Sequence, residues 1–408
     1  MGNKKHVILW CWWYDRQDLM TPLLPVMAEA ENHFLFYRFP EQEKLDFELP
    51  GKRHYWTEYK TPYNVINDLR PDKVVFMGIE SMLTIALRSA CRKKGIKTFY
   101  LTHGLTMAYS KTAENERSVI HERLDERFKK DSAYYTRNKN HSLYFFLHAF
   151  SRAPLVEKAF LIKFALKTKS IPRLHERLYH CQSHWRLADK YIVITKHLGR
   201  LMVERDGVKD DRIIEVGPYT LDYLFNALRE YKGGQPGMQP YFLLIDQPLA
   251  MITEEAQNKF FNNLADTLSS MGYQLKVKLH PRKYKLADAT RHANISWVRD
   301  EIPLDDLIMN ASACLGYFST LLLPVIWFKP CGIFNPSNNI LADEWIEMGV
   351  VKKLEFGNVK KEDLLDVLRE GATFNKEGFK QKYLFQVDGK GVERIGNVLL
   401  EKKQEEIN

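Results

Sequence analysis

Three short stretches in the second half of the chain carry the residue types expected at a phosphate-binding site. Each contains or follows an apolar run: LLIDQPL at 243–249, KLHPR at 278–282 and LGYFSTLLLP at 315–324. His280 and Arg282 supply hydrogen-bond donors and positive charge for an anion. Ser319 and Thr320 are predicted to open a helix, where free N–H groups and the helix dipole attract phosphate oxygens. Together they predict a site for a pyrophosphate or phosphodiester that stabilises a nucleotide leaving group.

Each stretch alone has an ordinary structural explanation. Ser319-Thr320 fits a helix N-cap, the commonest role of these residue types at that place. His280-Pro281 and Asp246-Gln247-Pro248 both fit turns that end strands. The order and spacing of the three stretches are more specific than any one of them. We therefore predict His280 as a catalytic group and the following donor-binding residues: Gln247, Pro248, Lys278, Pro281, Arg282, Gly316, Ser319 and Thr320.

The segments that must position these residues alternate between strand and helix patterns. In the first half, the apolar runs 6–13 and 73–79 are each followed by a helical pattern, and the segment 97–104 is a further strand. The segment 189–224 repeats this rhythm. In the second half, strand patterns that begin at 241, 274, 295, 313 and 331 are separated by helical ones. This alternation predicts an α/β protein with parallel, doubly wound sheets, in which ligands bind at the carboxyl ends of the strands.

The distribution of Gly, Pro and charge predicts the domain organisation. We expect a Rossmann-like N-terminal domain over 1–228, a Gly- and Pro-rich linker over 229–240, a nucleotide-binding Rossmann-like domain over 241–385 and a helical tail over 386–408. A basic, helix-prone segment at 113–188 interrupts the first domain. Two such domains are expected to face each other across a cleft.

The order LLIDQPL, KVKLHPR, IPLDDLI and LGYFST resembles the carboxyl-terminal domain of bacterial lipooligosaccharide sialyltransferases and capsular polysialyltransferases, over about residues 240–335. The resemblance implies a two-domain GT-B glycosyltransferase that uses CMP-sialic acid. It also implies that His280-Pro281 and Ser319-Thr320 hold the CMP phosphate, with the histidine protonating or stabilising the departing group. Over the first domain the resemblance is only architectural.

The general base of that family has no counterpart at its usual place. Shortly after QPL the family has an acidic pair followed by glycine, whereas this chain has Ala250-Met251-Ile252 there. We therefore predict a base from the first domain, either His103 or Glu80, each at a predicted strand end. A histidine accepts a hydroxyl proton effectively near neutral pH. Gly217 is predicted to close the first domain near the donor.

The resulting hypothesis is an enzyme that moves a sugar from a nucleotide-activated donor to a hydroxyl of a bacterial surface glycan: lipooligosaccharide, O-antigen or capsule. The expected donor is CMP-linked, with a sialic acid- or Kdo-like sugar. We predict no metal and no other cofactor, because protein groups neutralise the phosphate charge. The alternatives are a CDP-polyol phosphotransferase, a UDP-sugar-using GT-B enzyme or epimerase, and a non-catalytic nucleotide- or glycan-binding scaffold.

The net charge of +9 is concentrated in one segment. Residues 128–173 hold ten Lys or Arg and two acidic residues, a difference of +8, so the rest of the chain is nearly neutral and no nucleic-acid-binding surface is indicated. Aromatic residues among these cations predict a basic amphipathic helix that binds an anionic membrane surface. The alternative is a helical insertion that packs on its own domain with a solvated basic face.

The N-terminal segment and the cysteines indicate the cellular compartment in which the protein is expected. The N-terminus has no secretory signal pattern, and no apolar run is long enough to span a membrane. The five cysteines are scattered without metal-binding spacing, as in reduced proteins. We expect a cytoplasmic protein that is peripheral on the inner face of the plasma membrane.

Overall fold

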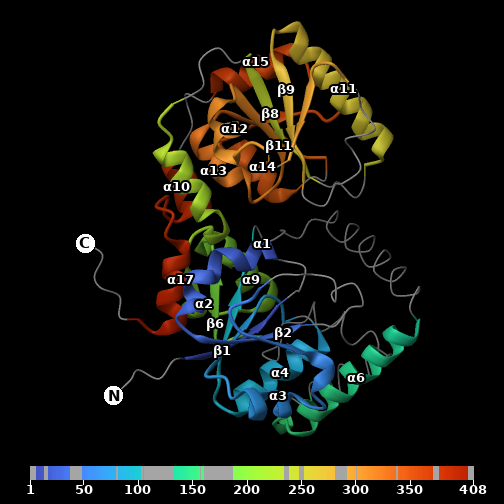
Figure 1. The fold of residues 1–408 in the computed structure, drawn as a ribbon, viewed down its shortest axis with the longest axis vertical. Helices are drawn as coiled ribbons and strands as arrows, with labels where there is room; N and C mark the ends of the chain where they lie inside the picture. Colours follow the sequence, from blue (N-terminus) through green and yellow to red (C-terminus); the bar gives the residue numbers. More distant parts are fainter. Residues whose placement is uncertain are drawn as a thin grey trace. The chain divides into compact units, whose positions relative to one another are not determined.

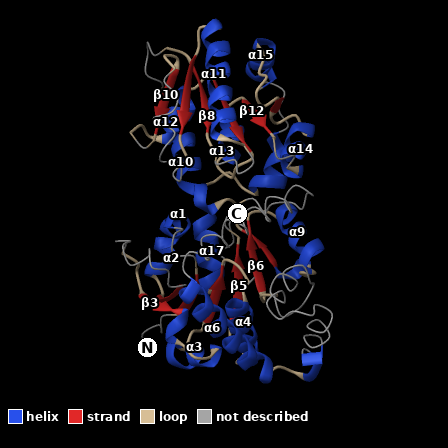
Figure 2. Ribbon diagram, turned by 90° about the vertical axis from the view of Figure 1, so that its right-hand side faces the viewer, coloured by secondary structure: helices blue, strands red, loops and turns tan. Residues whose placement is uncertain are grey.

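The computed structural model describes residues 6–12, 17–36, 48–79, 81–102, 104, 132–156, 158–159, 187–233, 239–247, 252–280, 292–299, 301–336, 339–370 and 376–402. These residues form two compact units (Figure 1). The first unit falls within 1–104, 127–220 and 390–408, and the second comprises the described part of 221–389. Each unit is built on one parallel sheet with helices on both faces (Figure 2).

The sheet of the first unit has the strand order β3-β2-β1-β4-β5-β6-β7. All of its pairings are parallel, with Leu9 of β1 opposite His33 of β2 and Val74 of β4. The inner strands at 7–11, 73–76 and 190–193 are mainly apolar because both faces of the sheet are covered, whereas the edge strand at 52–55 reads Lys-Arg-His-Tyr. Their bounds are β1 (Val7–Cys11), β2 (Glu31–Phe36), β3 (Lys52–Tyr55), β4 (Lys73–Phe76), β5 (Lys97–Leu101), β6 (Lys190–Val193) and β7 (Ile213–Glu215).

The helices of the first unit begin and end at recognisable capping residues. Thr61, Ser81 and Thr195 each accept a backbone N–H of the following helix, and Gly207 ends α9 with φ +69°. One core lies where α3, α4 and α6 cover the sheet, and a second lies under α1, α2 and α17. The helices are α1 (Gln17–Met20), η1 (Thr21–Leu23), α2 (Leu24–Ala28), η3 (Trp56–Glu58), α3 (Pro62–Leu69), α4 (Met82–Lys93), α6 (Ser132–Ser151), α9 (Lys196–Asp206), η4 (Asp210–Arg212), η5 (Tyr219–Leu221), at the border of the two units, and α17 (Gly391–Leu400).

The sheet of the second unit has the order β10-β9-β8-β11-β12-β13, again parallel throughout. Its strands are β8 (Tyr241–Ile245), β9 (Gln274–Lys278), β10 (Ile295–Val298), β11 (Ala313–Tyr317), β12 (Cys331–Phe334) and β13 (Lys352–Leu354). Side chains of α11 and α15 cover one face of it. The helices are α10 (Asp222–Glu230), α11 (Glu254–Ser270), α12 (Leu304–Asn310), α13 (Leu322–Phe328), α14 (Ile340–Glu347), α15 (Lys361–Glu370), α16 (Lys376–Phe379) and the π-helical turn η7 (Lys380–Leu384).

The predicted α/β class with two doubly wound, Rossmann-like units is confirmed by these two sheets. The boundary between the units differs from the predicted linker at 229–240. Helix α10 belongs to the second unit because it packs against α12 and α13, with the Phe225 and Phe328 ring centroids 6.4 Å apart. The first unit also includes α17 from the predicted tail, because Ile395 and Leu399 are fully buried in its core.

Within the predicted insertion at 113–188, the structure describes helix α6 and the residues immediately after it. The inner face of α6 is part of the first core, where Phe145, Phe146 and Ala149 are buried. The ring of Phe145 meets that of Trp56 edge-on, with centroids 5.7 Å apart. The predicted alternative, a helix that packs on its own domain, therefore holds for this face of α6.

Candidate active site

Strand order places three of the predicted motifs side by side in the second unit. β8 lies between β9 and β11, and the chain reverses its direction of winding between β8 and β11. Gln247, His280 and Ser319 each follow their strand by two residues. Because the strands are parallel, these three positions lie at the same carboxyl edge, at the topological switch point where α/β sheets bind ligands.

The alternation of side chains assigns Lys278 and Gly316 to one face of this sheet. Leu275 and Val277 pack in the core that includes α11, so Lys276 and Lys278 point to the opposite face. The ammonium of Lys276 accordingly lies 4.0 Å from the Tyr241 ring centroid. Gly316 is on this same face, in register with Ile245, and a Cβ atom there would lie 3.1 Å from the side chain of Leu322. Helix α13 therefore packs closely over Gly316.

Ser319 and Thr320 form the turn that leads into α13. The Leu321 N–H donates to Ser319 Oγ at 3.3 Å, and the Leu322 N–H donates to the Ser319 carbonyl at 3.1 Å. The predicted helix start at Ser319 was wrong by one turn, because α13 begins at Leu322. Since Oγ accepts the backbone bond, the Ser319 hydroxyl keeps its proton to donate elsewhere.

Asp246 is a buried carboxylate at this edge that sequence reasoning treated only as part of a turn. Its side chain is 3% exposed, and its Oδ1 accepts a hydrogen bond from Gln257 Nε2 at 3.3 Å. Its backbone N–H donates to the Lys278 carbonyl at 3.0 Å, which ties the ends of β8 and β9 together. The sequence did contain a signal for this burial, because Asp246 directly follows a wholly apolar strand. Aspartate is seldom buried without a partner, so such a position predicts a hydrogen-bonded carboxylate.

The phenol of Tyr317, the last residue of β11, is kept protonated at this edge. Burial, followed by the negative charge of Asp246, raises the pKa of Tyr317 well above its ordinary value. Among the described residues its hydroxyl and the amide oxygen of Gln247 are buried without a hydrogen-bond partner. The edge therefore combines a carboxylate, a neutral phenol, an amide and an imidazole with the cationic side chain of Lys278.

Five of the predicted residues lie outside the described residues. They are Glu80, His103, Pro248, Pro281 and Arg282. Gly217 is described: it follows β7 in the first unit with φ +84°, and its N–H donates to the Ile194 carbonyl at 3.0 Å. The structure thus brings together Gln247, Lys278, His280, Gly316, Ser319 and Thr320, all in the second unit.

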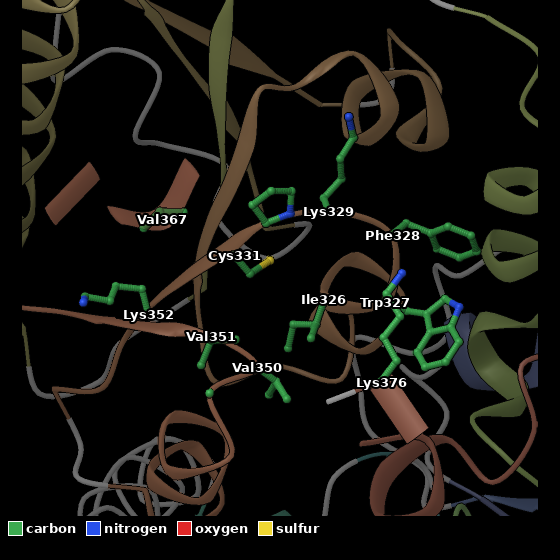
Figure 3. A pocket seen from close by; sticks show the side chains of 12 residues that line it. Ile326, Trp327, Phe328, Lys329, Cys331, Val350, Val351, Lys352, Val367 and Lys376 are labelled. Atoms are coloured by element: carbon green, nitrogen blue, oxygen red, sulfur yellow. The ribbon is translucent and has the colours of Figure 1, made fainter. Parts of the chain in front are cut away.

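A pocket of about 70 Å³ lies at the other end of the same sheet (Figure 3). Its lining includes Cys331 and Lys352, the first residues of β12 and β13, so it opens at the amino ends of the strands. Ile326, Val350 and Val351 supply apolar surface, and none of the predicted site residues lines it. The pocket is therefore separate from the candidate active site.

Two further features concern metals and membranes. Within the described ranges, no cluster of three or more His, Cys, Asp or Glu side chains is arranged to hold a metal ion. The described helices also include none that is long and apolar enough to cross a bilayer.

A match to a protein-family model shows which family this chain belongs to. The family model described as Alpha-2,8-polysialyltransferase (POLYST) matches residues 41–331. The chain belongs to the alpha-2,8-polysialyltransferase family. The matched region extends from the first unit to the start of β12 and includes all three motifs at the carboxyl edge. This polysialyltransferase-family chain is a nucleotide-sugar-dependent glycosyltransferase, as the resemblance implied.

Solved structures show the same GT-B architecture as this polysialyltransferase-family chain. Methanocaldococcus jannaschii UDP-GlcNAc 2-epimerase, in complex with UDP-GlcNAc and UDP, matches with a TM-score of 0.52 and 14% identity over 98% of this chain and 100% of that one. S. aureus MnaA in a co-structure with UDP matches with a TM-score of 0.51 and 13% identity over 97% and 96%. A variant of the wall teichoic acid polymerase TagF matches with a TM-score of 0.51 and 10% identity over 97% and 88%. No curated protein matches the sequence.

Proposed function

We propose that this chain transfers a sialic acid- or Kdo-like sugar from a CMP-linked donor to a hydroxyl of a bacterial surface glycan. The observation that carries the proposal is the convergence of Gln247, His280 and Ser319 at one carboxyl edge, in a chain of the polysialyltransferase family. Lipooligosaccharide, O-antigen and capsule are the acceptor classes that this chemistry fits.

In the proposed reaction the acceptor hydroxyl attacks the anomeric carbon of the donor. His103 or Glu80 takes the hydroxyl proton as general base. A bond forms between the acceptor oxygen and the anomeric carbon while the bond from that carbon to the phosphate oxygen breaks, and the electron pair leaves with CMP. His280 protonates or hydrogen-bonds the departing phosphate oxygen, so the enzyme stabilises the negative charge where it develops.

Other groups at the edge complete the proposed phosphate site. The Ser319 hydroxyl has a proton to donate, because its oxygen already accepts the Leu321 N–H. Lys278 and Arg282 add positive charge, and Arg282 in particular can form two parallel bonds to a phosphate. Gly316 keeps α13 close to the strand ends, and the proposed donor site also includes Gln247, Pro248, Pro281, Thr320 and Gly217. We propose that these protein groups neutralise the phosphate without a metal ion.

The direct test is the nucleotide released from different donors. Purified full-length chain is incubated with CMP-sialic acid, CMP-Kdo, a CDP-polyol, UDP-GlcNAc or a GDP-sugar, each with and without a lipooligosaccharide or capsule acceptor. We expect CMP release that depends on acceptor and on one of the two CMP-sugars. Release of CDP or UDP would contradict the donor class, and no release with any donor would favour the non-catalytic scaffold.

A second part of the proposal places the chain on the cytoplasmic face of an anionic membrane. Tyr144 and Leu147 on the outer face of α6 are 53% and 49% exposed, and Leu155 and Val156 beyond its end are 82% and 74% exposed. In the sequence, these apolar residues belong to the segment 128–173, which also holds ten Lys or Arg. Apolar side chains beside cations are the combination that binds an anionic membrane surface.

Vesicle flotation tests this second part. We expect the wild-type chain to float with vesicles that contain phosphatidylglycerol and to float less with neutral phosphatidylcholine vesicles. The double variant Leu147→Ser, Leu155→Ser should lose flotation, whereas Leu24→Ser, an exposed apolar residue on α2, should not. Equal flotation with both kinds of vesicle, or equal loss in both variants, would contradict membrane binding through α6.

A further inference from the structure

A chain of titratable side chains runs across the edge of the first sheet. His33 Nδ1 on β2 lies 2.9 Å from His54 Nε2 on β3, and His54 Nδ1 lies 3.0 Å from the Tyr59 hydroxyl. At the other end, His33 Nε2 lies 3.5 Å from Glu31 Oε1. His33 is only 5% exposed and His54 is half-buried, so the contact between the two imidazoles is partly shielded from water.

Hydrogen-bond chemistry fixes a single direction for this chain when both histidines are neutral. An ionised Glu31 only accepts, so His33 presents Nε2–H to it and leaves Nδ1 bare. His33 Nδ1 then accepts from His54 Nε2–H, and the bare His54 Nδ1 accepts from the Tyr59 hydroxyl. Every proton in this arrangement has an acceptor.

Added protons disrupt this arrangement in two steps. The first proton places N–H on both nitrogens of His33, so His54 must accept from it and turn its own Nδ1–H toward Tyr59. A second proton sets two N–H groups against each other across the 2.9 Å contact. Two cationic imidazoles cannot share that contact, so the pair must separate.

The surroundings favour the neutral pair. Burial is the largest influence and lowers the pKa of both His33 and His54. The other charged groups that act on the two rings or on Tyr59 are Glu31 and Lys52 from β2 and β3, Glu58 from η3 and Asp68 from α3. Burial, with Glu58 and Asp68, raises the pKa of Tyr59 to about 12, so the phenol stays neutral.

The row of side chains Glu31–His33–His54–Tyr59 is also connected to helix α6. His141 Nε2 on α6 lies 2.8 Å from the Tyr59 carbonyl, and the His141 ring packs 5.8 Å from that of Phe145. Phe145 in turn meets Trp56, three residues before Tyr59. The segment 54–59 therefore connects the two parts. Its His54 and Tyr59 side chains belong to the row of titratable groups, and its Trp56 ring and Tyr59 carbonyl contact α6.

We propose that the Glu31–His33–His54–Tyr59 chain is a proton-operated clasp that holds α6 on the first unit and loosens it on acidification. In the neutral state the chain anchors segment 54–59, whose Tyr59 carbonyl and Trp56 ring contact α6. When both imidazoles are protonated they repel each other, segment 54–59 moves, and α6 loses those contacts. This clasp goes beyond the transferase activity and needs neither donor nor acceptor.

Hydrogen–deuterium exchange of the full-length chain tests the clasp. Exchange of the α6 amides 144–150 is followed from about pH 7.5 to about pH 5.5 and corrected for intrinsic exchange rates. We expect the opening constant of α6 to rise with acidity, up to roughly tenfold per pH unit for each proton taken up. Strands β8 and β9 of the second unit should show no such change.

Matched histidine variants identify the groups that sense pH. In His54→Gln, whose amide can still donate and accept but does not titrate, the pH response of α6 should be lost. In His292→Gln, which alters a histidine paired with Asp266 in the second unit, it should be retained. A wild-type α6 that exchanges equally at both pH values, or a His54→Gln chain that responds like the wild type, would overturn the proposal.

A wild-type measurement keeps the test decisive if His54→Gln fails to fold. In chain labelled with ¹³C at the histidine rings, His33 and His54 should titrate below their ordinary pKa of about 6.5, in two coupled steps. Independent titration of either residue at or above that value would also overturn the proposal.

Discussion

Asp246 illustrates how one polar side chain can be retained at the end of an apolar strand. Its carboxylate accepts the Gln257 amide, and its backbone N–H bonds to the Lys278 carbonyl. The bond to Gln257 depends on the aspartate side chain, whereas the backbone bond to Lys278 does not. Position 246 therefore ties the end of β8 to α11 through the carboxylate and to the end of β9 through the backbone.

We predict that Asp246→Ala lowers the free energy of unfolding of the second unit by about 1–3 kcal/mol, because Gln257 Nε2 is left buried without its acceptor. Asp266→Ala in the same unit is the matched control, since its side chain is 73% exposed and pairs with His292 at the surface. That change should cost at most about 0.5 kcal/mol. Urea denaturation of both variants is the measurement, and equal losses would contradict the role given to Asp246.

The residues of the candidate site differ in how far the sequence could predict them. Gln247, His280 and Ser319 could be placed at one edge because each follows an apolar strand in an alternating pattern. The cap bond from Leu321 to Ser319 could not be predicted, because it depends on where the turn gives way to helix. The burial of Asp246 depends on Gln257, which reaches it from a different element. Glu80 and His103 stay predictions.

At the scale of elements, the closest packing at the site is between β11 and α13. A Cβ atom at Gly316 would lie 3.1 Å from two methyl carbons of Leu322, tighter than ordinary side-chain contact. Leu322 is fully buried and opens α13, so it has little room to withdraw. The turn at Ser319-Thr320 lies between these two contact points and would move with the helix.

We therefore predict that Gly316→Ala displaces α13 and lowers kcat/KM for the donor by about tenfold, because a small misplacement of a phosphate-binding group is costly. The free energy of unfolding should fall by about 1–3 kcal/mol. Steady-state kinetics and urea denaturation measure the two effects. Gly233→Ala, where a Cβ atom meets nothing within 4 Å, should change neither. Unchanged kinetics in Gly316→Ala would show that α13 does not position the site.

The composition of helix α6 does not predict which of its side chains face the core. The sequence predicts an amphipathic, basic and aromatic helix, and it cannot tell which aromatic residues face inward. The structure assigns Phe145 and Phe146 to the core and leaves Tyr144 and Leu147 outside. The choice depends on α3 and α4, which supply the surface against which α6 packs.

The two faces of α6 should respond differently to truncation. Phe145→Ala is expected to lower the free energy of unfolding by about 3–5 kcal/mol, because a fully buried ring is removed from the core of the first unit. Leu147→Ala, on the half-exposed outer face, should change it by less than about 0.5 kcal/mol. Thermal and urea denaturation compare the two variants directly. A larger loss for Leu147→Ala would reverse the assignment of the faces.

At the scale of the whole molecule, helix α17 packs in the same unit as strand β1, although the two are far apart in the sequence. The ammonium of Lys73, which is 3% exposed, donates to the Leu399 carbonyl at 2.6 Å and lies 3.2 Å from Glu401 Oε1. Lys97 reaches the same carboxylate at 2.8 Å. The sequence predicts a helical tail over 386–408, within which the structure describes α17 at Gly391–Leu400, but nothing local to this segment indicates a partner such as Lys73, far away along the chain. Contacts of this kind depend on the folded topology and not on local pattern.

The contacts of Glu401 with Lys73 and Lys97 should give the stability a defined pH dependence. Hydrogen bonds from Lys97 and Lys73 lower the pKa of the Glu401 carboxyl from 4.5 to about 2. The folded state therefore holds this proton less tightly than the unfolded state, so the stabilisation is complete above pH 4.5 and is lost as the pH falls toward 2. Because Glu401 is 49% exposed, we expect its contribution to be at most about 1 kcal/mol.

The variant Glu401→Gln should thus be less stable than the wild type at neutral pH, and the difference should shrink as the pH falls below 4.5. Urea denaturation at several pH values measures this difference. Glu230→Gln, an exposed position at the end of α10, should show no pH-dependent difference from the wild type. A difference for Glu401→Gln that stays constant or grows on acidification would contradict the account.

The most direct test of the central claim is the turnover of His280→Ala with the CMP-sugar that the wild type uses. If the imidazole stabilises the departing phosphate, kcat should fall by about 10²–10³, the usual cost of removing one group that stabilises developing negative charge. The control His292→Ala, another histidine of the second unit that precedes the amino end of β10, should keep wild-type turnover. Undiminished transfer by His280→Ala would show that the carboxyl edge of β8, β9 and β11 is not the active site.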